Sequence, residues 1–157
     1  MRPDDAADTA AFIVVHHVRG TMTSRTASTV AVRDFSILAD EPVEREGTNK
    51  GPTPLELVLV SLCAGINIAT GRVAHQIGFV YSSLQVSARG ELDTRRRLGM
   101  SSEAPLHYRS IEVGVEVGTV EPIHQVERVA ELVDGTSAVV SLVRAAVPDY
   151  RAKWERV

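Results

Sequence analysis

The sequence predicts an α+β fold in which antiparallel strands pack on helices. Two segments, Leu84–Leu92 and Ile111–Val117, alternate apolar and polar residues, which is typical of antiparallel strands with one buried face. A long, almost wholly apolar helical stretch begins at Pro54. Along the chain, strands are followed by this helix, two further strands, a helix pair and a last strand, an order that suits an α+β domain.

The N-terminal part predicts a tail and two extended segments. Residues 1–10 are polar and alanine-rich, so we expect a flexible N-terminal tail, followed by a single domain over residues 11–157. Ala11–Arg19 is rich in β-branched residues and predicts a strand. Ser28–Leu38 predicts a second extended stretch. Its apolar face changes phase near Arg33, which indicates a bulge or a break into two strands.

A loop without periodicity covers Ala39–Thr53. Connections of this length without secondary structure of their own are usually either functional or disordered. We therefore expect one of these two properties for the segment that leads into the long helix.

The long helix has the clearest boundaries. Thr53, Pro54 and Glu56 form a capping-box pattern, with Thr53 as N-cap and Pro54 at the first helical position. Gly78 is the expected C-terminal glycine. The segment Leu55–Ala69 is apolar nearly all round, as in a helix that is enclosed on most sides. A second subunit could supply part of that cover.

The C-terminal third predicts two helices and a strand. The first helix opens at Pro122, runs to about Asp134 and is broken by Gly135. Thr136 or Ser137 can cap the second helix. Alternating residues at the C-terminus predict a last strand.

Composition limits the function classes. The chain has 157 residues, of which 44% are hydrophobic and 24% charged, as in an ordinary soluble domain with one core. A net charge of −3 argues against nucleic-acid and anionic-membrane partners. The longest apolar stretch, Leu57–Ile66, is too short to span a bilayer. The N-terminus lacks the pattern of a secretory signal, so a cytoplasmic location is expected.

Cysteine and histidine usage predicts neither a metal site nor a cofactor. Cys63 is the only cysteine, so neither an intrachain disulfide nor a cysteine-rich zinc site can form, and a reducing compartment is indicated. The five histidines lack the spacing of metal ligands. Arginine far outnumbers lysine, which hints at a bacterial source with a GC-rich genome.

Two segments carry a family resemblance. VRDFSILADEP, which begins at Val32, and EGTNKGPTPLELVLVSL, which begins at Glu46, resemble the OsmC/Ohr superfamily of osmotically inducible and organic hydroperoxide resistance proteins. The resemblance implies antiparallel sheets wrapped around long central helices in an intertwined homodimer. It also implies peroxiredoxin-like reduction of organic hydroperoxides in oxidative stress defence. The family uses one cysteine in the central helix, a second near the start of a later helix, and an arginine that holds the thiolate.

The family's two cysteine positions are substituted in this chain. Counted from Pro54, the reactive cysteine falls at Gly65, and the second cysteine corresponds to Thr136. Because threonine cannot form a disulfide, the two-cysteine cycle cannot run within one chain. Cys63 lies two positions before Gly65, rotated about 200° around the helix.

Two hypotheses follow, and the sequence leaves open whether the chain is an enzyme. In the first, Cys63 reduces the hydroperoxide alone, Arg33 holds its thiolate, and an external thiol regenerates it. In the second, the chain is redox-inactive, Cys63 is a small core residue, and a small apolar ligand binds in a cavity at the dimer interface. The expected substrate- or ligand-binding residues are Gly65, Asn67 and Thr136.

Overall fold

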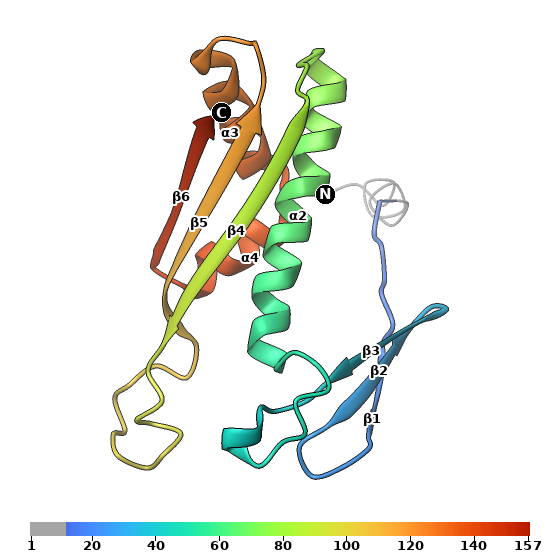
Figure 1. Cartoon of the computed structure of the whole chain (residues 1–157), viewed down its shortest axis with the longest axis vertical. Coiled ribbons are helices and arrows are strands. Elements are labelled where there is room, and N and C mark those ends of the chain that lie inside the picture. The colour runs from blue at the N-terminus through green and yellow to red at the C-terminus, as the bar shows by residue number, and fades with distance from the viewer. Residues whose placement is uncertain (1–11) are drawn as a thin grey trace, which may run out of the picture. The chain divides into compact units, whose positions relative to one another are not determined.

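The computed structural model of the protein describes residues 12–157, and its helices and strands are shown in Figure 1. The expected flexible tail, residues 1–10, lies outside this part of the chain. The chain divides into two compact units between Pro54 and Leu55. Each unit is described by itself.

The N-terminal unit contains a three-stranded antiparallel sheet made of β1 (Arg19–Met22), β2 (Ser28–Val32) and β3 (Phe35–Ala39), in that order. The expected break near Arg33 is confirmed. Val32 pairs with Phe35, so a two-residue turn joins β2 and β3. Arg33 has a φ of 52°, a left-handed conformation that tight hairpin turns require.

The strand expected over Ala11–Arg19 is wrong for all of its described residues except the last. Only Arg19 belongs to β1, while Phe12–Val18 lies in no strand and is exposed. β-branched residues favour an extended backbone, but a strand also needs a neighbour to accept its hydrogen bonds. No described residue pairs with Phe12–Val18.

Asp40 organises the loop that precedes the long helix. Its side chain is completely buried, and its carboxylate accepts five hydrogen bonds. The donors are the backbone N–H groups of Glu41, Thr48 and Lys50 and the hydroxyls of Thr26 and Thr48. The loop also contains the short 3-10 helix η1 (Val43–Arg45). Hydrogen bonds to the carboxylate of Asp40 therefore fix the conformation of most of this loop.

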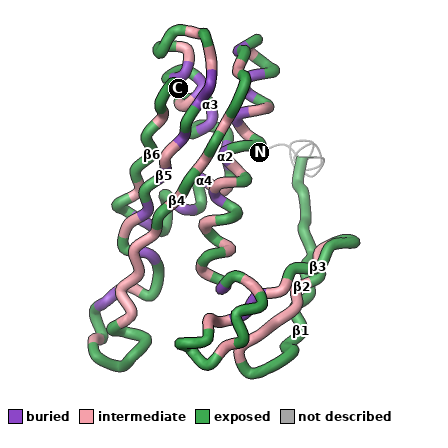
Figure 2. The backbone as a smooth tube through the Cα atoms, viewed as in Figure 1, coloured by how far each residue is buried: buried purple, intermediate pink, exposed green. Residues whose placement is uncertain are grey.

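The second unit begins with α2 (Pro54–Ile77), whose predicted boundaries are confirmed. Gly78 follows with a φ of 73°, as a C-terminal glycine should. One face of α2 is buried, whereas Val60 and Ile68 on another face are 55% and 58% exposed. Figure 2 shows the same alternation of buried and exposed residues along this helix. Within the second unit, α2 is therefore covered on one side only.

The second unit also contains a three-stranded sheet. Its strands are β4 (Ser83–Leu92), β5 (Tyr108–Gly118) and β6 (Asp149–Arg156), in that order. β4 and β5 are antiparallel, as the alternation predicted, but β6 runs parallel to β5. The parallel pairing follows from the connection, because two helices carry the chain back to the end at which β5 began.

Those two helices are α3 (Ile123–Thr136) and α4 (Ala138–Ala146). Gly135 does not break the first helix as expected, since α3 continues through Thr136. Ser137 stands between the helices and caps α4 by accepting a hydrogen bond from the Val140 N–H. Apolar residues of α2, the inner sheet face, α3 and α4 form one core.

By length and composition, α2 also satisfies the criterion for a membrane-spanning helix, with a mean hydropathy of 1.7 over its best window. The expectation from the sequence rested on Leu57–Ile66 alone, which is too short to span a bilayer. The apolar character of α2 continues beyond Ile66, so the whole helix meets the length criterion. Core helices of globular domains meet the same criterion, and residues of α2 belong to the core of this unit.

Candidate functional site

Gly65 marks a close approach of α2 to the start of α4. A Cβ at Gly65 would lie 3.2 Å from Cβ of Val139 and 3.8 Å from Oγ of Ser137. Glycine lets two backbones approach where a side chain would hold them apart. The position that the family resemblance assigns to the reactive cysteine is therefore occupied by a helix–helix contact.

Ser137, rather than Thr136, faces Gly65. Ser137 is buried, and its hydroxyl accepts the N-cap hydrogen bond of α4. Thr136 is exposed, and its hydroxyl donates to the carbonyl of Leu132 at 2.6 Å. The structure thus brings Gly65 and Ser137 together and leaves Thr136 outside this contact.

Cys63 is half-buried on α2. Burial is the main influence on its thiol and raises the pKa above its ordinary value, while a backbone hydrogen bond opposes the shift. Desolvation penalises the thiolate, and a nearby cation would be needed to offset it. Within this environment, the thiolate of Cys63 is less favoured than the thiolate of an exposed cysteine.

Tyr150 on β6 is the residue that sequence reasoning missed. Its hydroxyl oxygen is buried and has no hydrogen-bond partner among the described residues. Burial, followed by the charge of Asp134, raises the pKa of Tyr150 to about 12, and the Cys63 thiolate adds to the shift. Tyr150 packs against the core, where a hydroxyl needs a hydrogen-bond partner.

An ion pair stands beside Tyr150. The guanidinium of Arg144 lies 5.8 Å from the centre of the Tyr150 ring, a cation–π distance. Arg144 also donates a hydrogen bond to Asp134. Tyr150 and this ion pair therefore connect β6 with α3 and α4 next to the core.

The two remaining expected site residues are exposed. Asn67 is exposed on α2. Arg33 belongs to the N-terminal unit, where its guanidinium lies 5.0 Å from the Phe35 ring centre. The neighbours of Gly65 are Val139 and Ser137, and Asn67 is not among them. Arg33 belongs to the other unit.

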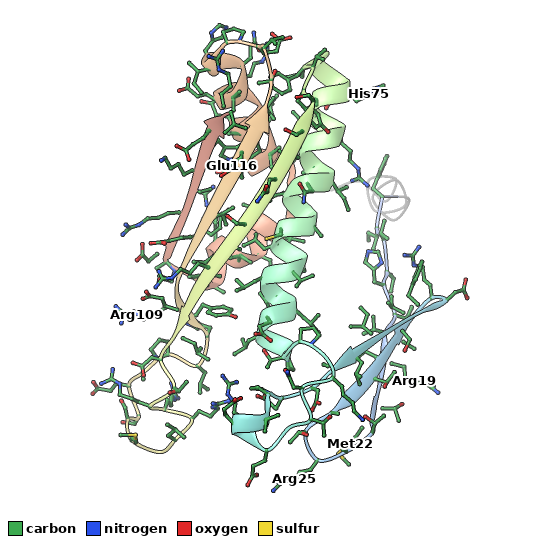
Figure 3. The ribbon with its side chains drawn as sticks, in the orientation of Figure 1. Arg19, Met22, Arg25, His75, Arg109 and Glu116 are labelled. Carbon is green, nitrogen blue, oxygen red and sulfur yellow. The ribbon has the colours of Figure 1, made fainter. Side chains whose placement is uncertain are left out.

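No metal site is found in residues 12–157, where no group of three His, Cys, Asp or Glu side chains gathers. His75 projects from the last turn of α2 and Glu116 from the polar face of β5, as Figure 3 shows. Close to the core, α2, β6 and the start of α4 provide a thiol (Cys63), a buried phenol (Tyr150) and a serine hydroxyl (Ser137).

Comparison with known proteins gives a family match. A family model described as "OsmC-like protein" matches residues 47–148. No curated protein matches the sequence. Among solved structures, an OsmC-like protein from Mycoplasma pneumoniae is similar with a TM-score of 0.80 and 15% identity, covering 92% of this chain and 98% of that chain.

Two further structures are named for hydroperoxide resistance. The organic hydroperoxide resistance protein OsmC from Legionella pneumophila has a TM-score of 0.69 and 12% identity, with 91% of this chain and 98% of that chain covered. The organic hydroperoxide resistance protein from Elizabethkingia anophelis has a TM-score of 0.73 and 11% identity, with coverage of 92% and 98%. At these identities the likeness establishes the fold.

Proposed function

The chain belongs to the OsmC-like protein family, and on that premise we propose that it reduces organic hydroperoxides with Cys63 as its only reacting thiol. One observation carries the proposal: the single cysteine of the chain is half-buried on α2, the helix that contains the family's cysteine position. Cys63 keeps part of its surface exposed, and the neighbouring apolar core suits an apolar substrate.

The reaction needs one substrate and two external thiols. The Cys63 thiolate attacks the terminal oxygen of the hydroperoxide, the O–O bond breaks, and the alkoxide takes up a proton to leave as an alcohol. Cys63 is then a sulfenic acid. One external thiol converts it to a mixed disulfide with release of water, and a second restores the Cys63 thiol and leaves as an external disulfide.

Arg33 is the proposed source of positive charge for the thiolate. Burial alone raises the pKa of Cys63, so catalysis near neutral pH requires a group that favours the charged form. Arg33 lies in the VR segment that carries the family resemblance, in the exposed turn between β2 and β3. The family resemblance implies an arginine that holds the thiolate, and Arg33 is the residue of this chain that matches it.

A homodimer is the proposed working form. Val60 and Ile68 are apolar, more than half exposed and on the uncovered side of α2. Large apolar side chains that adjoin on one helix face are typical of an interface. A second copy of the chain would remove them from water, in agreement with the expectation for α2 from the sequence.

Redox inactivity with binding of a small apolar ligand is the second candidate. The observation in its favour is that Gly65 is closed by Val139 and Ser137, while the pKa of the only thiol is raised. A chain with those properties retains the family fold and an apolar interface without the family's thiol chemistry.

Peroxide turnover separates the two candidates. The full chain, Cys63→Ser and Arg33→Ala are each mixed with cumene hydroperoxide and dithiothreitol, and the loss of peroxide is followed. The proposal expects turnover in the wild type, none above background in Cys63→Ser, and a slower rate in Arg33→Ala. Arg25→Ala, which removes another exposed arginine of the same unit, serves as the matched control. No turnover above background in either the wild type or Cys63→Ser would leave the redox-inactive, ligand-binding candidate.

A further inference from the structure

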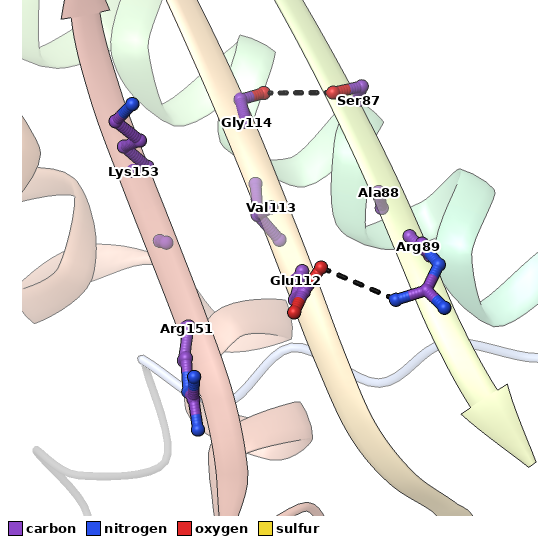
Figure 4. Close-up of a pocket in the computed structure, with 9 residues that line it drawn as sticks. Ser87, Ala88, Arg89, Glu112, Val113, Gly114, Arg151 and Lys153 are labelled. Carbon is purple, nitrogen blue, oxygen red and sulfur yellow. Dashed lines mark hydrogen bonds and ion pairs between the residues drawn. The ribbon is translucent and has the colours of Figure 1, made fainter.

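The hydroxyl of Tyr150 is buried on the core side of the second sheet. Tyr150 packs against the core, and its hydroxyl oxygen has no hydrogen-bond partner among the described residues. Figure 4 shows the opposite face of the sheet, from which Arg151 and Lys153 of the same strand project. A buried hydroxyl without a partner lowers stability, so a binding or catalytic role is the kind of explanation that it calls for.

The ion pair of Arg144 and Asp134 holds the ring of Tyr150. The guanidinium of Arg144 lies 5.8 Å from the ring centre, at a cation–π distance, and it donates a hydrogen bond to Asp134. One positive charge is thus balanced by one negative charge, and the pair acts on the ring as a support. The cation–π contact involves the ring of Tyr150 and leaves its hydroxyl available to another group.

Cys63 borders the same core from α2. Leu59 packs against the core and Ile66 belongs to it. These two residues lie four positions before and three positions after Cys63, and residues at such spacings share one side of a helix. The negative charge of a Cys63 thiolate also acts on Tyr150, where it adds to the larger effects of burial and of Asp134 in raising the pKa of the phenol. Cys63 and Tyr150 therefore lie at one core and interact through their charges.

The protonation states of the two groups complement each other. Burial, followed by the charge of Asp134, raises the pKa of Tyr150 to about 12, so the phenol keeps its proton at neutral pH. A thiolate at Cys63 favours that proton further, because a second negative charge nearby is unfavourable. The thiol can therefore ionise while the phenol stays protonated, which provides a nucleophile and an acid at the same time.

We propose that Tyr150 is a further catalytic residue, which donates a proton to the alkoxide released when Cys63 attacks an organic hydroperoxide. The inference rests on the proposed function of Cys63. The thiolate sulfur forms a bond to the terminal oxygen, the O–O bond breaks, and Cys63 becomes a sulfenic acid. The alkoxide takes the proton of the Tyr150 hydroxyl and leaves as an alcohol, because an alkoxide is a stronger base than a phenolate. The phenolate then regains a proton from the solvent.

The leaving group of the peroxide tests this role. Cumene hydroperoxide releases an alkoxide, which needs a proton, whereas peracetic acid releases acetate, which is a weak base and needs none. The full chain is mixed with an excess of each peroxide, and the loss of the Cys63 thiol is followed. Tyr150→Phe should slow the reaction with cumene hydroperoxide roughly 10²-fold, as expected for the loss of a positioned acid. The same variant should react with peracetic acid at nearly the wild-type rate.

Tyr108→Phe is the matched control, because it removes a hydroxyl that donates to the Leu55 carbonyl. It should keep the wild-type ratio of the two peroxide rates. Alkylation of Cys63 by iodoacetamide, in which iodide leaves without a proton, should proceed equally in wild type and Tyr150→Phe. Slower alkylation of Tyr150→Phe, together with equal losses for both peroxides, would show that Tyr150 acts only on the environment of the thiol and would overturn proton donation.

The remaining outcomes separate this inference from the proposed function. An unchanged ratio of the two peroxide rates in Tyr150→Phe would overturn the role of Tyr150 and leave Cys63 as the reacting thiol. A wild type that reacts with neither peroxide would overturn the proposed function and this inference with it. If Tyr150→Phe fails to fold, solvent deuterium isotope effects on the wild type decide the question. Proton donation predicts a larger effect with cumene hydroperoxide than with peracetic acid, and equal effects would overturn it.

Discussion

Gly65 and Val139 are packed so closely that a Cβ at residue 65 would lie 3.2 Å from the Val139 Cβ. Few Cβ atoms in proteins have a neighbour at that distance, so a side chain here requires Val139 to move. The contact explains physically why the family's cysteine position can hold glycine in this chain: the space for the sulfur is used by α4.

Gly65→Cys should therefore lower the free energy of unfolding by about 1–2 kcal/mol, because overpacking outweighs the gain in helix propensity. Urea denaturation of the reduced protein measures this. Val139→Ala alone should also destabilise, but the double variant should lose less than the sum of the two single changes. Additive losses would mean that residues 65 and 139 do not compete for the same space.

Two of the three tyrosines of the second unit, Tyr108 and Tyr150, should respond in opposite ways to loss of the hydroxyl. Tyr108 donates to the Leu55 carbonyl at 3.0 Å, so Tyr108→Phe should cost about 1 kcal/mol. The buried Tyr150 hydroxyl has no partner among the described residues, so Tyr150→Phe should be neutral or stabilise by up to about 1 kcal/mol. Thermal and urea unfolding check both. Equal losses would show that Tyr150 has a partner, such as a bound water.

Acid stability should depend on Asp40. Hydrogen bonds, chiefly from the Thr48 hydroxyl, lower its pKa to about 2 from an ordinary value of 3.8. A lowered pKa in the folded state stabilises the protein above the ordinary value, and this contribution is lost as the pH falls from about 4 to about 2. Asp93, whose pKa is also lowered to about 2, acts in the same range.

Asp40→Asn should consequently be less stable at neutral pH and should show a shallower loss of stability on acidification. Asp34→Asn, a change in the exposed turn after β2, is the control and should keep the wild-type slope. Unfolding curves at several pH values provide the comparison. An Asp40→Asn chain with the full wild-type slope would contradict the role given to Asp40.

The exposed side of α2 should govern association. Ile68→Glu or Val60→Glu places a charge where the proposed dimer buries apolar surface, so each variant should elute as a monomer in light-scattering chromatography. Val120→Glu is the matched control, because Val120 is 94% exposed and does not belong to α2. A wild type that is monomeric at all concentrations would exclude the proposed assembly.

Elements with local signals could be predicted from the sequence. Pro54 and Gly78 fix the ends of α2 through backbone chemistry that depends on a few neighbouring residues. The parallel pairing of β6 could not be predicted from its alternation, because direction is set by the connection through α3 and α4. Phe12–Val18 has strand-forming residues without a strand neighbour among the described residues.

The candidate site follows the same rule. Cys63 and Gly65 lie on the same helix, so their separation around the helix axis could be predicted from their spacing in the sequence. The contact of Gly65 with Ser137 depends on how α4 crosses α2, and the unsatisfied hydroxyl of Tyr150 depends on the whole inner face of the sheet. Both required the three-dimensional structure.

Intact-mass measurement of peroxide-treated protein tests the central claim, reaction at Cys63, most directly. Wild type and Cys63→Ser are exposed to cumene hydroperoxide without reductant at several pH values. The account predicts an adduct of about +16 or +32 Da on wild type beyond any methionine oxidation that the two proteins share. Because burial raises the pKa of the thiol and the thiolate is the nucleophile, the rate of adduct formation should increase as the pH is raised. No adduct on the folded wild type, with oxidation only after denaturation, would contradict the claim that Cys63 is the reacting thiol.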